Sequence, residues 1–132
     1  MAWLIDTNVA IHLRDGHDAV LDRIAQLDSM PLLSAVSVVE LEGGVYRDPA
    51  QAPIRRARLD LLLGQFAILS FDAQTAEAYG RIVAATGYSR TKVIDRMIAA
   101  QAIVHRATLI TMNAADFRDI PGLAMEAWDS PQ

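Results

Sequence analysis

Short apolar runs of strand length alternate along this chain with segments of helical periodicity. A parallel strand has to be followed by a crossover before the next strand can lie beside it, and a helix is the usual crossover. The alternation therefore favours an α/β fold with a parallel sheet covered by helices on both faces. The runs that we interpret as strands are 3–5, 31–34, 66–69, 108–111 and 124–128.

The segments between these runs carry residues typical of helix ends. Asp72 stands where an N-cap is expected, and Gly87 stands where a helix would stop. Ser37 and Glu40 have the spacing of a capping box, which predicts that a helix begins at residue 38. The short helix after the first strand is expected to be capped by Thr7 or Asn8. The predicted helices cover 9–13, 18–27, 38–46, 53–63, 73–86 and 92–107.

Size and composition exclude several classes of protein. The 132 residues suit one domain, 1–132, and the lack of cysteine excludes disulfides, a thiol nucleophile and thiolate metal sites. No apolar stretch reaches the roughly 20 residues of a membrane span, and Asp6 comes too early for a signal peptide, so we expect a cytoplasmic protein with no membrane partner. The net charge of −4 means that any binding of nucleic acid must be local.

Four carboxylates follow predicted strands or begin predicted helices: Asp6, Glu40, Asp95 and Asp116. Each has an ordinary alternative role, as a helix cap or as a partner of a helix dipole. In a parallel sheet, however, the strand ends share one edge, so the four would converge there. Two like charges about 4 Å apart repel by about 4 kcal/mol at an effective dielectric near 20, so such a cluster needs protons or a cation. Ligands that are all oxygen favour Mg²⁺ or Mn²⁺, and a water held by such an ion can hydrolyse a phosphodiester.

The motifs around these carboxylates resemble, in order and spacing, those of the PIN-domain ribonucleases, and most closely the VapC toxins of bacterial toxin–antitoxin modules. The resemblance extends from residue 4 to residue 128, and it implies a PIN-like three-layer α/β/α sandwich with a five-stranded parallel sheet in the order 3-2-1-4-5. The motifs are LIDTN at 4–8, SVVEL at 37–41, DRMIAA at 95–100 and TMNAADF at 111–117.

The resemblance also assigns roles to individual residues. Asp6, Glu40 and Asp95 match the acidic triad of the family, and Asp116 matches its fourth acidic position. On this basis we expect Asp6 and Asp95 to hold the metal ion directly, with Glu40 and Asp116 completing the ring or binding its waters. Four polar residues match positions that line or support the site: Thr7, Asn8, Thr111 and Asn113.

The activity implied by the resemblance is that of a type II toxin, a Mg²⁺- or Mn²⁺-dependent endoribonuclease inhibited by a cognate VapB antitoxin in the bacterial cytoplasm. A homodimer is expected, as is a toxin–antitoxin hetero-oligomer that contacts operator DNA only through the antitoxin. The apolar faces of helices 38–46 and 53–63 are candidate walls for an antitoxin groove. The RNA target is not predicted.

Arg90 and Lys92, shortly before Asp95, are the candidates for binding the RNA backbone, with Arg14 as a further candidate. The arginines at 55, 56 and 58 are interpreted as ordinary surface residues.

Two other functions stay open. One is a catalytically weak PIN scaffold that acts by binding antitoxin and operator. The other is a receiver-like phosphoacceptor module. It would require a second acid at 2–5, which is absent, and an aspartate at the end of the strand 66–69, where Ser70 stands instead.

Overall fold

The computed structural model describes residues 1–131, and its centre is a five-stranded sheet in the order β3-β2-β1-β4-β5. Every neighbouring pair of strands is parallel, and β1 pairs with β2 on one side and with β4 on the other. The predicted fold class and strand order are confirmed. The strands are β1 (Trp3–Ile5), β2 (Leu32–Ser34), β3 (Ile68–Leu69), β4 (Thr108–Thr111) and β5 (Met125–Ala127).

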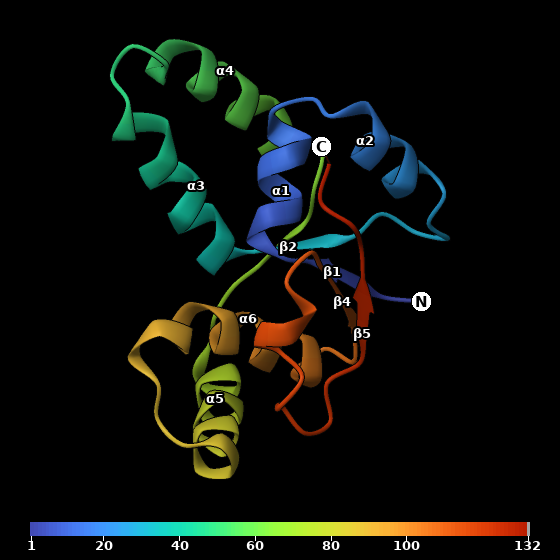
Figure 1. Ribbon diagram of the computed structural model, residues 1–132, viewed down its shortest axis with the longest axis vertical. Coiled ribbons are helices and arrows are strands. Elements are labelled where there is room, and N and C mark those ends of the chain that lie inside the picture. The colour runs from blue at the N-terminus through green and yellow to red at the C-terminus, as the bar shows by residue number, and fades with distance from the viewer. Residues whose placement is uncertain (132) are drawn as a thin grey trace.

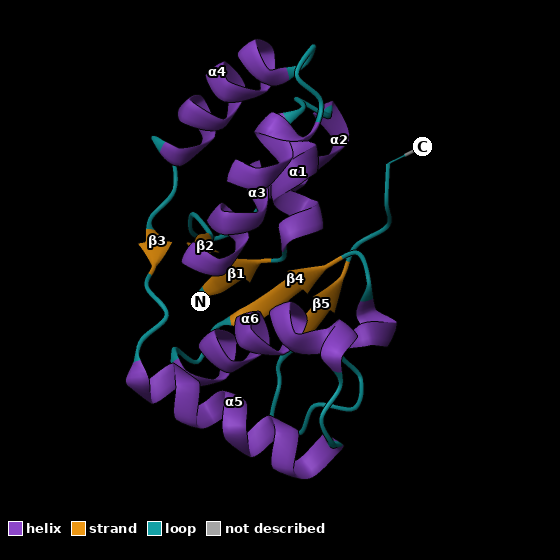
Figure 2. Ribbon diagram, turned by 90° about the vertical axis from the view of Figure 1, so that its left-hand side faces the viewer, coloured by secondary structure: helices purple, strands orange, loops and turns teal. Residues whose placement is uncertain are grey.

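Helices cover both faces of this sheet. Figures 1 and 2 show α1 to α4 on one face and α5 and α6 on the other, which makes three layers. None of the helices found within residues 1–131 is both long and apolar enough to cross a membrane. The helices are α1 (Thr7–Arg14), α2 (Asp18–Ala25), α3 (Ala35–Arg47), α4 (Ala52–Leu63), α5 (Ala73–Thr86) and α6 (Val93–Val104), with 3₁₀ turns η1 (Arg90–Lys92) and η2 (Ala114–Asp116).

The sheet separates two hydrophobic cores. Successive side chains of a strand point to opposite faces, so Leu4 packs in the core under α5 and α6, whereas Ile5 packs in the core under α1 to α4. Leu109 and Ile110 of β4 divide in the same way. All four side chains are completely buried, which explains why these strands read as continuous apolar runs.

The start of α3 differs from the sequence-based prediction. The helix begins at Ala35, and Ser34 is its N-cap, with the Ser34 hydroxyl accepting a hydrogen bond from the Val36 amide at 2.9 Å. Ser37 lies inside the helix, so the predicted capping box with Glu40 is wrong. Register explains the difference, because β2 pairs Leu33 with Ile5 and ends at Ser34, so that the helix begins at the next residue.

The start of α1 also differs, because the N-cap is Asp6 in place of Thr7 or Asn8.

A buried glutamine links the two helical layers. Gln101 of α6 accepts a hydrogen bond from the Ser34 hydroxyl, and its amide nitrogen donates to the carbonyl oxygens of Leu69 and Ser70 at 3.1 and 3.2 Å. Both Gln101 and Ser34 are completely buried. The link holds α6 against the ends of β2 and β3, beside the start of α3.

Candidate active site

The candidate site lies where the strand order of the sheet reverses. From β1 the chain builds β2 and β3 outward on one side, and it later returns to place β4 and β5 on the other. In open α/β sheets, ligands bind in the crevice beyond the strand ends at such a point. Asp6 directly follows β1, and its amide donates to the carbonyl of Ile110 in β4 at 2.9 Å. A cavity of about 400 Å³ opens here, and Asp6, Glu40 and Asp95 line it.

The Asp6 carboxylate is held by two neutral donors. The Thr7 amide donates to Oδ1 at 2.8 Å, and the Thr111 hydroxyl donates to Oδ2 at 2.9 Å. The Thr111 hydroxyl in turn accepts a hydrogen bond from the backbone N–H of Asn113. Burial raises the pKa of Asp6, although these two hydrogen bonds act against it, and the charges of Glu40 and Asp116 raise it further. Asp6 is therefore fixed in direction while its charge is poorly compensated.

Glu40 reaches the cavity from α3 and is oriented through two hydroxyls. The Thr7 hydroxyl donates to Glu40 Oε1 at 2.7 Å, and it lies 2.8 Å from the Ser37 hydroxyl. Because the single proton of Thr7 goes to the carboxylate, Ser37 must donate to Thr7. Ser37 is completely buried. Its part in this chain of hydroxyls was not predicted, although three residues of helix place it on the same face as Glu40.

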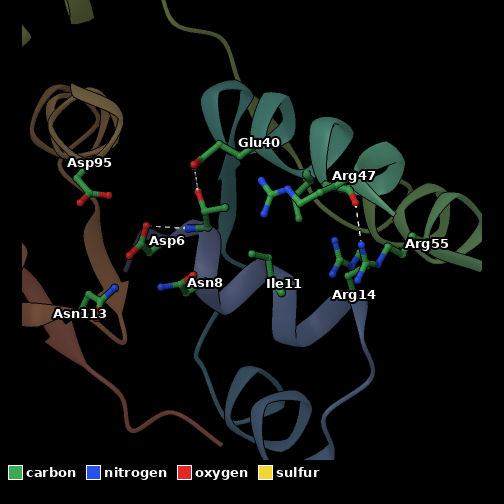
Figure 3. Close-up of a pocket in the computed structure, with 12 residues that line it drawn as sticks. Asp6, Asn8, Ile11, Arg14, Glu40, Arg47, Arg55, Asp95 and Asn113 are labelled. Atoms are coloured by element: carbon green, nitrogen blue, oxygen red, sulfur yellow. Dashed lines mark hydrogen bonds between the residues drawn. The ribbon is translucent and has the colours of Figure 1, made fainter. Parts of the chain in front are cut away.

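Asp95 lies in the first turn of α6 and approaches the cavity from the other helical layer. Figure 3 shows its carboxylate on the same side of the cavity as Asp6. Burial is the first cause that raises the pKa of Asp95 from 3.8 to about 6, followed by the charges of Asp6, Asp116 and Glu40. The nearby charge of Lys92 lowers it.

The remaining acidic and polar candidates take different positions. Asp116, half-buried in η2, does not line the cavity, but its charge raises the pKa of both Asp6 and Asp95. Asn8 and Asn113 line the cavity and are exposed.

These four carboxylates lack a positively charged partner. None of the ion pairs within residues 1–131 involves Asp6, Glu40, Asp95 or Asp116. As the side chains stand, no three acidic or histidine groups in the described part of the chain are close enough to hold one metal ion together. Magnesium usually keeps several waters and binds one or two carboxylates directly. A donor set that consists of oxygens facing one another across a cavity therefore fits a hydrated hard cation.

The basic candidates divide into those inside and outside the cavity. Arg14 lines it, together with Arg47 and Arg55, which were not predicted to belong to the site. Arg90 and Lys92 do not line it; they form η1, next to the start of α6. The sequence held a signal for Arg47, because it follows Glu40 by seven residues and so lies on the same face of α3.

Comparisons with known proteins give matches over most of the chain. The model of the PIN domain family matches residues 3–123. Ribonuclease VapC2 of Rickettsia felis is 29% identical over 136 residues, which cover 98% of this chain and 99% of that protein. The tRNA(fMet)-specific endonuclease VapC of Salmonella typhimurium is 27% identical over 132 residues, covering 97% of this chain and 98% of that protein. The crystal structure of VapBC2 from Rickettsia felis bound to a DNA fragment from their promoter matches with a TM-score of 0.86 and 27% identity, covering 98% of this chain and 100% of that one.

Proposed function

This chain belongs to the PIN domain family, and we propose on that premise that it is the toxin of a type II toxin–antitoxin pair, an endoribonuclease that hydrolyses RNA phosphodiester bonds. One observation carries the proposal. Carboxylates from both helical layers face a single cavity at the reversal point of the sheet, and no ion pair among residues 1–131 neutralises them. We propose the bacterial cytoplasm as the place of action, because an RNA substrate and an antitoxin would both be present there.

PIN-domain nucleases as a class use divalent metal ions. For this chain we assign Mg²⁺ or Mn²⁺, since the donors are all oxygen. Asp6 and Asp95 would hold the ion directly, and Glu40 and Asp116 would complete the ring of ligands or bind its waters. When bound, the ion supplies positive charge that acidifies water and neutralises phosphate oxygens.

The side chains of this protein orient the acidic groups and can accept a proton from the attacking water. Thr111 and the Thr7 amide fix the Asp6 carboxylate, so that it does not have to reorganise when substrate binds. Glu40 uses Oε1 to accept from Thr7, while its Oε2 makes no hydrogen bond among the described residues and can accept a proton from water. Hydrolysis by water leaves a 5′-phosphate and a 3′-hydroxyl.

A cleavage assay with purified protein tests this proposal. Labelled initiator tRNA and total RNA are incubated with Mg²⁺ or Mn²⁺, and the ends of the products are identified. We expect cleavage that EDTA stops and that Asp6→Asn reduces at least about 100-fold, because this change removes a charged group from the reacting centre. Asp22→Asn, an exposed change in α2, serves as the control for loss of one negative charge. A cyclic phosphate at the product ends would contradict attack by water.

A catalytically weak scaffold that acts through antitoxin and operator binding is the second candidate, and growth assays separate it from the enzyme. Expression without antitoxin should stop growth, and Asp6→Ala should abolish the effect while the protein remains folded by circular dichroism. Growth inhibition that persists in the folded Asp6→Ala protein would favour the scaffold.

We propose a VapB-type antitoxin as the protein partner, in a hetero-oligomer that contacts operator DNA through the antitoxin, and a homodimer of the toxin. Large apolar side chains are exposed on α3 and α4, including Val39, Tyr46 and Leu61, which are 69%, 62% and 69% exposed. Contiguous exposed apolar surface is typical of interfaces, and we propose that these side chains form part of the antitoxin-binding surface. Replacing Leu61 and Val39 with serine should weaken toxin–antitoxin binding in a pull-down with the cognate antitoxin without changing RNA cleavage.

A further inference from the structure

The cavity that contains the carboxylates is also lined by three arginine side chains. Figure 3 shows Arg14 and Arg55 next to each other, with Ile11 between them and Asp6, while the Arg47 side chain extends from α3 along the cavity toward Glu40. The three arginines come from α1, α3 and α4, which pack against one another on one face of the sheet. We call these three residues the arginine end.

Arg14 is a buried and fixed member of this group. Only 8% of it is exposed, and its Nε and Nη2 donate to the Asp15 carboxylate at 3.0 and 3.4 Å. Its Nη1 makes no hydrogen bond among residues 1–131 and lies 3.6 Å from where a Cβ on residue 44 would stand. This guanidinium nitrogen therefore lies in contact with the wall formed by α3 at Gly44 and can still donate a hydrogen bond.

Arg55 converges on the same point of α3. Its Nη1 donates to the carbonyl oxygen of Gly44 at 3.0 Å, which holds the half-buried side chain against the helix. The other nitrogens of Arg55 make no hydrogen bond within the described chain, so their donors remain available. Arg47, in the last turn of α3, is exposed and makes no ion pair among the described residues.

The arginine end carries more positive than negative charge. Three guanidinium groups stand against one paired carboxylate, that of Asp15, which leaves a net charge of about +2. Guanidinium groups bind phosphate through paired N–H donors, and such contacts are stronger than those between neutral groups. An RNA chain with its scissile phosphate at the acidic end must continue past the cavity, and its neighbouring phosphates need positive charge.

We propose that Arg14, Arg47 and Arg55 form a phosphate subsite that binds the RNA backbone next to the bond cleaved at the carboxylates, an inference that rests on the proposed function. The subsite sets the direction of the RNA strand across the cavity, since one end of the cavity binds the flanking phosphate and the other end contains the cleavage site. Arg47 is its exposed and adjustable member, whereas Asp15 holds Arg14 and the carbonyl oxygen of Gly44 holds Arg55.

Binding without cleavage tests the subsite. A labelled single-stranded oligoribonucleotide is titrated with protein in EDTA at several salt concentrations, using wild type, Arg47→Ala, Arg55→Ala and the double variant. Each single change should weaken binding about tenfold and lower the slope of log K against log salt by about 0.7, the value for one phosphate contact on a single strand. Arg58→Ala is the matched control, because Arg58 is exposed on the same helix as Arg55 but does not line this cavity.

Arg55→Lys and thermal unfolding separate a contact from a folding defect. A subsite predicts that lysine restores part of the affinity and that all variants unfold at nearly the wild-type temperature. Equal RNA affinity for Arg47→Ala, Arg55→Ala and Arg58→Ala would overturn the inference. Loss of affinity for the antitoxin alone would overturn it too, because the arginine end would then belong to the protein partner.

A neutral linkage in the substrate tests the position of the subsite. An oligonucleotide with a methylphosphonate beside the cleaved bond should lower kcat/KM of the wild type and should cause little further loss in Arg55→Ala, because both changes remove the same contact. Independent, multiplicative losses would overturn the position assigned here. Arginine-dependent RNA binding by a protein that cleaves no RNA would refute the proposed nuclease and leave the subsite intact, and cleavage that ignores both arginines would do the reverse.

Discussion

Replacing Asp95 with asparagine should stabilise the metal-free protein at neutral pH. Asp95 is partly buried in α6, and burial and its acidic neighbours raise its pKa from 3.8 to about 6. Asp95 therefore ionises less readily in the folded protein than in the unfolded one, so its charge at neutral pH lowers the free energy of unfolding. Asparagine keeps the shape of the side chain and removes the charge.

The magnitude follows from the pKa difference. A pKa rise of about two corresponds to at most about 3 kcal/mol, at 1.36 kcal/mol for each pKa unit, and solvent screening of the half-buried side chain reduces this figure. Because the pKa of Asp95 is higher in the folded state, the contribution of Asp95 to wild-type stability is fully present below pH 3.8. It is lost as the pH rises through about 6. About 1.5 kcal/mol of it disappears between pH 5 and pH 7.5. The raised pKa of Asp6 adds to the same trend.

Urea denaturation in EDTA measures this directly. Wild type should be less stable at pH 7.5 than at pH 5, and Asp95→Asn should reduce that difference and gain about 2–3 kcal/mol at pH 7.5. Asp22→Asn, exposed in α2, should change neither value. Millimolar Mg²⁺ or Mn²⁺ should stabilise wild type more than Asp95→Asn, because the ion compensates the charge that the mutation removes. Wild-type stability that is flat with pH, or an Asp95→Asn protein weaker than wild type at pH 7.5, would refute the account of an uncompensated carboxylate cluster.

Three other substitutions test separate parts of the structure. Ser37→Ala should lower kcat on RNA about tenfold with little change in KM, because Glu40 loses the hydroxyl chain that orients it; its cost to stability in urea should be about 1 kcal/mol. Gln101→Ala should cost about 3 kcal/mol by the same measurement, since it leaves a void and strips hydrogen bonds from Ser34 and two carbonyls. Gly87→Ala should lower the thermal midpoint by a few degrees, reflecting about 1–2 kcal/mol, because Gly87 has φ +85° after α5; an unchanged midpoint would contradict it.

The sequence predicted those elements whose local signals agree with their tertiary setting. The runs at 3–5 and 108–111 became the central strands β1 and β4, because such runs can only be buried on both faces. The helix between Asp72 and Gly87 has its predicted bounds, and it carries a full capping box with Thr75. The strand order came from the resemblance, because periodicity alone does not say which strands are neighbours.

The errors arose where two local signals compete or where the contact is purely tertiary. Both Ser34 and Ser37 are residues that cap helices, and only the register of β2 with β1 selects Ser34. The arginine end depends on the packing of α1, α3 and α4, so it could not be found from spacing within one segment. That packing also places Arg55 in the cavity, although α4 alone gives it the appearance of an ordinary surface residue.

Glu40 and Asp95 approach the cavity from helices on opposite faces of the sheet, so the site is shared between the two helical layers. A shift of either helix relative to the sheet therefore changes the distance between the two acids, and the hydrogen bonds of Gln101 limit such shifts by tying α6 to the ends of β2 and β3. A protein engineer who rebuilds one layer for heat resistance has to keep the position of that layer's acid relative to the acid of the other layer.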